Sequence, residues 1–256
     1  MFFTNLFEAN LTTKYIAKEV IYYTHIDSTN DEVWLLSKKK NNTNRKLLVI
    51  TDNQKQGRGR GANQWVSKPG QSITCSFLLK NIFPSKQFNL NAILIPVAII
   101  KGIHKFTSIS LGIKWPNDIM YNDKKLGGIL IESRIIDNQI FLNIGIGLNI
   151  NECYQDFPDN LSNTAISLRE IAGHPIQREP LLASILNELD KMIDEIDTVS
   201  LINTWMENCM HINQQISFSE NNKPINGVFK TINEFGQAVI NYNNDDINYD
   251  GAITVL

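Results

Sequence analysis

The sequence has few cysteines, little net charge and no long apolar run, and each shortage excludes a class of protein. Its 256 residues hold three cysteines, far apart and without a C-x-x-C pair, so neither a disulfide framework nor a zinc site is expected and a reducing cytoplasm is favoured. A formal net charge of −2 argues against binding nucleic acid through bulk charge. No apolar run reaches the roughly 18 residues that span a bilayer, and the N-terminus does not resemble a signal peptide.

What is present suits an ordinary globular protein. Hydrophobic residues make up 43% and charged residues 20% of the chain, which excludes a mostly disordered chain and fits one large or two smaller domains. After Trp205 the pattern changes to short β-rich runs with turn signals, which predicts a small β domain over 213–256 behind a larger domain over 1–212. The polar residues 38–46 are interpreted as a solvated turn.

Hydrophobic periodicity divides the larger domain into strands and helices. Runs with the two-residue period or the β-branched composition of strands occupy 20–25, 47–51, 72–80, 126–136 and 139–151. We expect 72–80 to be half-buried, and the last two runs to form a hairpin through a turn at 137–138. The pattern also predicts a buried helix at 90–106 and an amphipathic helix at 181–196.

A turn and then a helix are predicted after the first strand. Ser28 and Asp31 have the spacing of a capping box ahead of the apolar residues 33–36. The N-terminus of a helix presents free backbone N–H groups and a positive dipole end, which suit a polar ligand. From this segment alone, a plain helix cap is the favoured interpretation.

Residues 54–65, Gln-Lys-Gln-Gly-Arg-Gly-Arg-Gly-Ala-Asn-Gln-Trp, follow neither period. The glycines let the backbone move and approach a ligand closely, while Arg58 and Arg60 offer planar forks of donors to carboxylate or phosphate. This composition predicts a loop that closes over an anionic ligand. An RNA-binding RGG tract is the alternative, but such tracts are usually long and disordered, whereas this loop lies between predicted strands. A P-loop is excluded because G-K-[ST] is missing.

A lysine and an aspartate stand out between 113 and 130. Lys125 begins an apolar strand, so its ammonium group is expected to be partly buried and to need an anionic partner. Asp118 lies close in the sequence, after a Pro-Asn turn. We expect Asp118 either to pair with Lys125 or to help hold a metal ion.

The run 139–151 alternates between an apolar face and a nearly bare one. Gly145, Gly147 and Asn149 lie on the bare face. Glycine inside a strand often marks the close approach of a ligand or another backbone. The G-x-G spacing is not a dinucleotide-binding fingerprint, because the third glycine and a following helix are missing.

The order of these motifs resembles the biotin–protein ligases over residues 20–150, and more loosely to the C-terminus. The motifs are Ser-Thr-Asn at 28–30, Q-x-x-G-R-G-R-G…W at 54–65, K-W-P-N-D…K-K-L-G-G-I-L-I-E at 114–132 and G-I-G-L-N at 145–149. The resemblance implies an α+β fold. Its catalytic domain, a mixed sheet with helices, is related to the class II aminoacyl-tRNA synthetases, and a small SH3-like β-barrel follows it.

The resemblance also implies an activity. Members of the family activate biotin with Mg-ATP to biotinyl-5′-AMP and pass the biotinyl group to a lysine of a biotin carboxyl carrier protein of acetyl-CoA carboxylase or a related carboxylase. Homodimers that pair strand to strand occur in the family. Only 27 residues precede Ser28, too few for the DNA-binding domain of roughly 60 residues that some relatives carry, so specific DNA binding is not expected. Membrane attachment is not expected either, because no apolar run is long enough to span a bilayer.

Residue roles follow from the matched motifs. The residues expected around biotin are Ser28, Thr29, Asn30, Gln54, Gly145 and Gly147. The residues expected in the closing loop are Arg58, Gly59 and Arg60. Lys125 matches the lysine that contacts the biotin carboxylate and the phosphate, and Asp118 is expected to serve the transfer step or to organise Lys125. Trp65 is expected near adenine, Asn149 near the phosphates or metal, and Arg178 near the nucleotide.

The outer edge of the glycine-rich loop departs from the usual pattern of the family. The loop continues as Ala62-Asn63-Gln64, where many family members carry more Arg, Gly and Lys, which leaves the outer edge of the loop unassigned.

A lipoate ligase shares the catalytic fold, but its own Arg- and Gly-rich signature is not found here. A non-enzymatic RNA- or protein-binding module would use the same loop and show salt-sensitive binding to nucleic acid.

Overall fold

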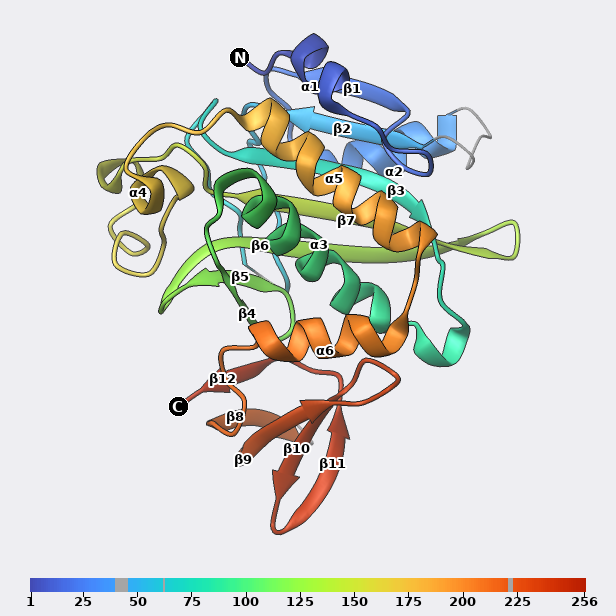
Figure 1. The fold of residues 1–256 in the computed structure, drawn as a ribbon, viewed down its shortest axis with the longest axis vertical. Coiled ribbons are helices and arrows are strands. Elements are labelled where there is room, and N and C mark those ends of the chain that lie inside the picture. The colour runs from blue at the N-terminus through green and yellow to red at the C-terminus, as the bar shows by residue number, and fades with distance from the viewer. Residues whose placement is uncertain (40–45, 62, 221–222) are drawn as a thin grey trace.

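A computed structural model describes residues 1–39, 46–61, 63–220 and 223–256 of the chain (Figure 1). Most of the predicted polar turn at 38–46 therefore lies outside the described residues, as does Ala62 of the loop. The described helices are α1 (Thr4–Asn10), α2 (Thr29–Lys39), α3 (Leu90–Thr107), α4 (Leu168–Ala172), α5 (Arg178–Asp194) and α6 (Thr198–Asn208), with single 3₁₀ turns at Ser85–Gln87 and Tyr154–Asp156.

The strands fall into two sheets. The first contains β1 (Glu19–Tyr23), β2 (Leu47–Thr51), β3 (Ile73–Lys80), β4 (Gly112–Lys114), β5 (Asp118–Tyr121), β6 (Lys124–Ile136) and β7 (Gln139–Leu148). The second contains β8 (Gln215–Glu220), β9 (Lys223–Ile232), β10 (Ala238–Tyr242), β11 (Asp245–Tyr249) and β12 (Ile253–Val255). The predicted α+β class is therefore confirmed.

The first sheet is mixed and has the order β1-β2-β3-β7-β6-β5-β4. β1 and β2 run parallel, and the other neighbouring strands are antiparallel. The predicted hairpin is confirmed: β6 and β7 meet at Asp137 and Asn138, both with positive φ, as a tight hairpin turn requires. Both glycines of the G-x-G motif lie within β7, so the strand runs through them and the rejection of a dinucleotide fingerprint is confirmed.

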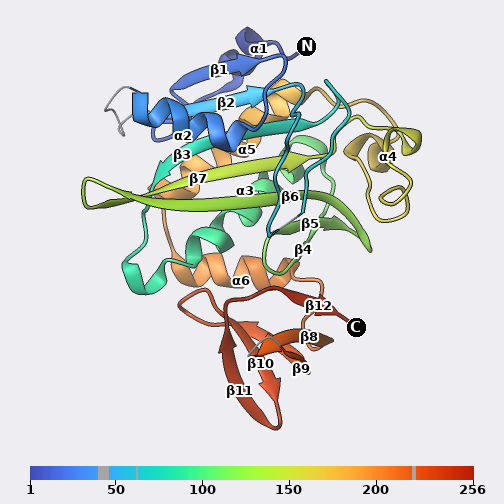
Figure 2. The same cartoon turned by 180° about the vertical axis from the view of Figure 1, so that it is seen from behind.

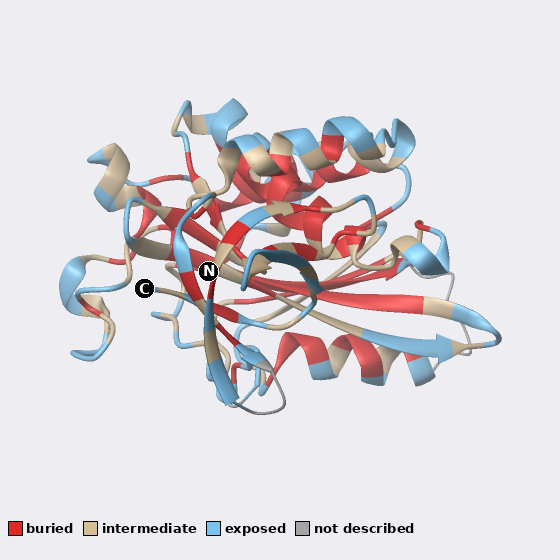
Figure 3. Cartoon of the chain, turned by 90° about the horizontal axis from the view of Figure 1, so that it is seen from below, coloured by how far each residue is buried: buried red, intermediate tan, exposed pale blue. Residues whose placement is uncertain are grey.

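Helices cover both faces of this sheet. α3 and α5 pack together on one face, as Figure 1 shows, and α2 packs on the other, where β2, β3 and β7 contact it (Figure 2). Because of α2, seven of the eight residues of β3 are buried. The prediction that this strand is half-buried was therefore wrong, since a single strand's pattern does not show what covers its second face. Buried residues follow the sheet between the two helical layers (Figure 3).

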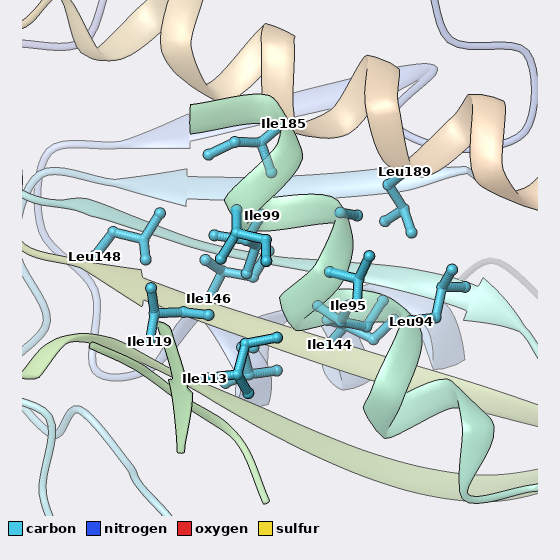
Figure 4. Close-up of a cluster of buried hydrophobic side chains, with 14 of the residues drawn as sticks. Leu94, Ile95, Ile99, Ile113, Ile119, Ile144, Ile146, Leu148, Ile185 and Leu189 are labelled. Atoms are coloured by element: carbon cyan, nitrogen blue, oxygen red, sulfur yellow. The ribbon is translucent and has the colours of Figure 1, made fainter. Parts of the chain in front are cut away.

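The predicted buried helix is confirmed as α3. It lies between the sheet and α5, where Leu94, Ile95 and Ile99 meet residues of β7 and α5 (Figure 4). α3 has 18 residues and, among the described helices, is the one long and apolar enough to cross a membrane, but 67% of it is buried inside the protein. That burial is typical of a core helix, and it explains why the helix is apolar on nearly every side.

The second sheet is antiparallel, with the order β11-β10-β9-β8-β12, and contacts α6 (Figure 1). Trp205 of α6 lies edge-on to Trp115, with ring centroids 5.9 Å apart, and Phe229 of β9 packs against both rings. The Trp115 indole also donates a hydrogen bond to the Gly251 carbonyl at 2.8 Å. The second sheet begins at Gln215, and the division into domains at 212/213 stays a prediction.

We expect the folded chain to become less stable as the pH falls from 7 to 5, because of His211. This side chain is 1% exposed and lies edge-on to Phe229, 4.4 Å between centroids. Burial, with a smaller effect of the Lys114 charge, lowers the pKa of His211 from 6.5 to about 4. Between these values the unfolded chain binds a proton that the folded chain does not, so the free energy of unfolding should fall by about 2 kcal/mol as the pH drops from 7 to 5.

Urea unfolding at the two pH values measures this loss. The matched variant is His211→Phe, which keeps an aromatic ring beside Phe229 and Trp205 and removes the titrating group. Its free energy of unfolding should change by about 2 kcal/mol less than that of the wild type. The same pH dependence in both proteins would contradict the assignment to His211.

Candidate active site

The predicted site residues converge on one cavity of about 540 Å³ beside the N-terminus of α2. Its walls come from the turn before α2, the 54–65 loop, β3, β7 and the segment from β4 to β6. The predicted residues that line it are Ser28, Thr29, Asn30, Gln54, Arg58, Gly59, Arg60, Trp65, Asp118, Lys125, Gly145 and Gly147. Sequence motifs that lie far apart in the chain thus share one space.

A buried hydrogen-bond network forms one end of the cavity. The Thr29 backbone N–H donates to Gln54 Oε1 at 2.8 Å, and the Thr29 hydroxyl lies 2.7 Å from the Ser76 hydroxyl. Ser76 in turn donates to Asn30 Oδ1 at 2.5 Å. The Ser28 hydroxyl accepts weakly from the Asp31 backbone N–H at 3.5 Å, consistent with the predicted cap. The side chains in this network are all uncharged, because Asp31 contributes only its backbone N–H, so this end suits an uncharged polar group. Ser76 was not predicted, because it lies inside an apolar strand.

The two β7 glycines make room for side chains from other segments. A Cβ on Gly145 would lie 2.2 Å from Asn30 Oδ1, and one on Gly147 would lie 2.5 Å from the Trp65 ring. The bare strand face therefore receives Asn30 and Trp65, and these two side chains form part of the cavity wall. Trp65 Nε1 and the hydroxyl of Thr74, which lies opposite Gly147 on β3, are buried without a hydrogen-bond partner among the described residues. Both residues line the cavity, so these unpaired polar groups lie in its wall.

Cationic side chains gather at the other end. Lys125 Nζ pairs with Asp118 Oδ1 at 2.7 Å, which confirms Asp118 as the predicted anionic partner. The backbone of Lys125 is held from both sides, because its N–H donates to the Thr164 carbonyl and its carbonyl accepts from Ile166 N–H. Lys114 also lines this end. No role was predicted for it, although it is the first residue of the K-W-P-N-D motif.

The glycine-rich loop is folded back on itself. Gly59 N–H donates to the Asn63 carbonyl at 2.8 Å, and Trp65 N–H donates to the Gly57 carbonyl at 3.0 Å. Its two arginines differ. Arg58 pairs with Asp31 at 2.8 Å and with Glu132 at 2.9 Å, whereas Arg60 is exposed and forms no ion pair within the described ranges. Of the two guanidinium groups, that of Arg60 is therefore the one left available to an anion.

Two residues that the resemblance singled out lie outside the cavity lining. Asn149 is buried after β7, where its side chain donates to the Ile166 carbonyl at 3.2 Å. Arg178 is buried in α5, pairs with Asp52 at 3.0 Å and donates to the Ser72 carbonyl. Both side chains have partners within the protein, and their expected contacts with a nucleotide stay predictions.

The second sheet also reaches the cavity. Ala252 and Ile253 are among its lining residues, and the bond from Trp115 to the Gly251 carbonyl holds that segment in place. The sequence contains no signal for this contact, because it depends on how the second sheet packs against the first.

Comparison with known proteins identifies relatives of this chain. The model of the Biotin/lipoate A/B protein ligase family matches residues 22–151. The bifunctional ligase/repressor BirA of Bacillus subtilis is 36% identical over 177 residues, which cover 69% of this chain and 54% of that protein. The biotin–protein ligase of Homo sapiens is 26% identical over 225 residues, 82% of this chain and 30% of that protein. The chain thus spans about half the length of the BirA relative.

Solved structures share the fold. The biotin protein ligase from Aquifex aeolicus in complex with biotin and ATP has a TM-score of 0.77 at 23% identity, covering 94% of this chain and 99% of that one. The ligase from Leishmania major with biotinyl-5-AMP has a TM-score of 0.64 at 20% identity, with 94% and 99% covered. Since the family model covers just over half of the sequence, this chain belongs to the Biotin/lipoate A/B protein ligase family.

Proposed function

We propose that this chain is a biotin–protein ligase. It joins biotin to ATP as biotinyl-5′-AMP, releases pyrophosphate, and transfers the biotinyl group to a lysine of a carrier domain. The observation that carries the proposal is the cavity itself, in which an uncharged polar end and a cationic end meet under an arginine-bearing loop. The family and the structural likeness to ligases support it.

The uncharged end suits the biotin ring system. A cyclic urea is neutral and needs an enclosing slot with a few placed donors and acceptors. Ser28, Thr29 and Gln54 supply hydroxyl and amide groups there. Gln54 has its Oε1 occupied by Thr29, so its NH₂ group is the part that can donate to the urea carbonyl.

The cationic end suits the reacting groups. A biotin carboxylate oxygen attacks the α-phosphorus of ATP, a new P–O bond forms, and the bond to the β-phosphate breaks to release pyrophosphate. Two anions approach each other in this step, and Arg60, Lys114 and Lys125 offset their repulsion and stabilise the charge that develops. Mg²⁺ enters with ATP as part of the substrate.

The transfer step uses the same cavity. The carrier lysine amine attacks the acyl carbon of the mixed anhydride, an amide forms and AMP leaves. Among the described residues that line the cavity, Asp118 carries the one carboxylate, so it can accept the proton that the amine releases. Because the anhydride hydrolyses readily, a loop that covers it and excludes water has a direct use.

Biotin-dependent exchange of labelled pyrophosphate into ATP tests the proposal. Purified protein with Mg²⁺ should catalyse this exchange with biotin and not with lipoate, and should then biotinylate the carrier domain of an acetyl-CoA carboxylase. Exchange that depends on lipoate and not on biotin would favour a lipoate ligase. Salt-sensitive binding to RNA without any exchange would favour the non-enzymatic binding module. A cytoplasmic location and a homodimer belong to the same proposal.

Replacing Arg60 by glycine should release the adenylate prematurely. Loss of one charge-assisted contact weakens binding by about 10- to 100-fold, so biotinyl-AMP formed in the cavity should dissociate faster by a similar factor. The amount of labelled adenylate that stays with the protein through gel filtration measures this. Arg60→Lys, which keeps the positive charge, should retain more adenylate than Arg60→Gly. Retention by Arg60→Gly at the wild-type level would contradict the role of Arg60.

A further inference from the structure

Glu132 on β6 accepts hydrogen bonds from three residues in two other parts of the chain, the glycine-rich loop and α2. Its two carboxylate oxygens accept from Arg58 Nη1 at 2.9 Å and from Arg58 Nη2 at 3.1 Å. Oε2 also accepts from Asn30 Nδ2 and from Trp34 Nε1, both at 3.2 Å. We refer to Glu132, Arg58, Asn30, Trp34 and Asp31, which also binds Arg58, as the Glu132 cluster.

The cluster joins two walls of the cavity from outside it. Arg58 belongs to the glycine-rich loop and Asn30 to the first turn of α2, and both line the cavity. Glu132 and Asp31 are not lining residues. The Glu132 carboxylate thus bonds a residue of the loop and a residue of the first turn of α2, both of which line the cavity, without lining it itself.

The geometry at Arg58 shows why one carboxylate matters more than the other. Glu132 forms a two-pronged pair with the guanidinium and its side chain is 28% exposed, whereas Asp31 accepts one bond and is 63% exposed. Two parallel bonds fix the orientation of the guanidinium plane, which a single exposed contact does not. Exposed pairs also lose most of their strength to solvent.

The pKa of the Glu132 carboxyl is shifted in the direction that a charged pair with Arg58 requires. Burial by itself raises the pKa of the Glu132 carboxyl, but the hydrogen bonds from Arg58, Asn30 and Trp34 outweigh burial, and the pKa is lowered from its usual value. The side chain is therefore ionised at neutral pH. A neutral replacement leaves Asp31 as the one ion-pair partner of Arg58 among the described residues, and Asp31 is exposed.

We propose that Glu132 is a positioning residue, which holds Arg58 so that the 54–65 loop stays folded over the cavity and in a fixed position relative to the first turn of α2. The role in catalysis rests on the proposed function, while the holding of the loop does not. Arg58 serves as the anchor of the loop, and Arg60, two residues further on, is left to meet the anionic ligand.

Limited trypsin digestion of the ligand-free protein tests the holding of the loop. Trypsin cuts after Arg58 and Arg60, and only where the loop opens. Glu132→Gln keeps the length of the side chain and an oxygen acceptor for Asn30 and Trp34, and removes the charged pair. We expect cleavage in the loop to become about tenfold faster. Asp31→Asn should change it less than threefold, and the exposed, remote Glu234→Gln should not change it.

A double-variant cycle identifies the partner. If Glu132 acts through Arg58, adding Glu132→Gln to Arg58→Lys should raise the cleavage rate little beyond that of Arg58→Lys alone. Lysine at this position is still cut by trypsin, so the readout is preserved. Cleavage by Glu132→Gln at the wild-type rate, or equal and additive effects of the two changes, would overturn the proposal.

Kinetics of pyrophosphate exchange test the catalytic consequence. In Glu132→Gln, KM for biotin should rise about tenfold with a smaller change in kcat, since the first turn of α2 and the loop lose their fixed positions while Lys125 and Arg60 are intact. A fall in kcat with unchanged KM would overturn the positioning role. If the wild type shows no exchange, the proposed function fails, and the trypsin experiment still decides whether Glu132 holds the loop.

Discussion

Lys125→Ala should lower biotin-dependent pyrophosphate exchange by about 10³-fold, the loss typical when a group that stabilises developing charge is removed. The Lys125 ammonium lies at the cationic end of the cavity, 2.7 Å from Asp118. Its removal takes away a positive charge where the carboxylate meets the α-phosphate. It also leaves Asp118 as an uncompensated negative charge in the same place, which adds to the repulsion.

The neighbouring Lys124 supplies the matched control. Successive residues of a strand point to opposite faces, and Lys124 is not among the cavity residues. Lys124→Ala should therefore keep exchange near the wild-type rate. Both variants should unfold at the same urea concentration as the wild type within error. The loss of pyrophosphate exchange in Lys125→Ala would then come from the missing ammonium group and not from unfolding. Near-normal exchange by Lys125→Ala would remove Lys125 from the mechanism.

Gly145→Ala should destabilise the protein by about 3 kcal/mol, at the upper end of what an overpacked buried position costs. The added Cβ would lie 2.2 Å from Asn30 Oδ1 and 3.1 Å from its Cγ. Asn30 is buried and short, and it is held by Ser76 and Glu132. It has no room to move without breaking these hydrogen bonds. Urea unfolding of the ligand-free protein measures the cost.

A second variant separates this clash from a general effect of alanine in β7. Asn30→Ala removes the side chain that the new Cβ would meet. Adding Gly145→Ala to Asn30→Ala should therefore cost less than about 1 kcal/mol, so that the two changes are strongly non-additive. Additive costs would mean that Asn30 is not the reason why glycine occupies this position.

Local patterns predicted the elements that depend on neighbours in the sequence. The β6–β7 hairpin follows from two alternating runs and a two-residue turn at 137–138. α3 follows from a run apolar on nearly all sides. The pair of Lys125 with Asp118, seven residues apart, follows from a lysine at the start of an apolar strand. Each of these needs only short-range information.

The sequence did not predict features in which a residue is buried by, or bonded to, another element of the fold. β3 was expected to be half-buried, because its alternation does not show that α2 covers the second face. Ser76 was overlooked for the same reason, since a serine within a strand has no signal of its own until Thr29 and Asn30 are brought against it. Ala252 and Ile253 reach the cavity only through the packing of the second sheet.

The sequence by itself determined the family resemblance, the order of the motifs and the residue types that meet at the cavity. Only the tertiary structure decided how the two loop arginines differ, with Arg58 bound to Glu132 and Arg60 free within the described residues. Glu132 lies 74 residues from Arg58 and 102 from Asn30. Contacts over such distances depend on strand register and on how the loop folds back, and a local pattern contains neither.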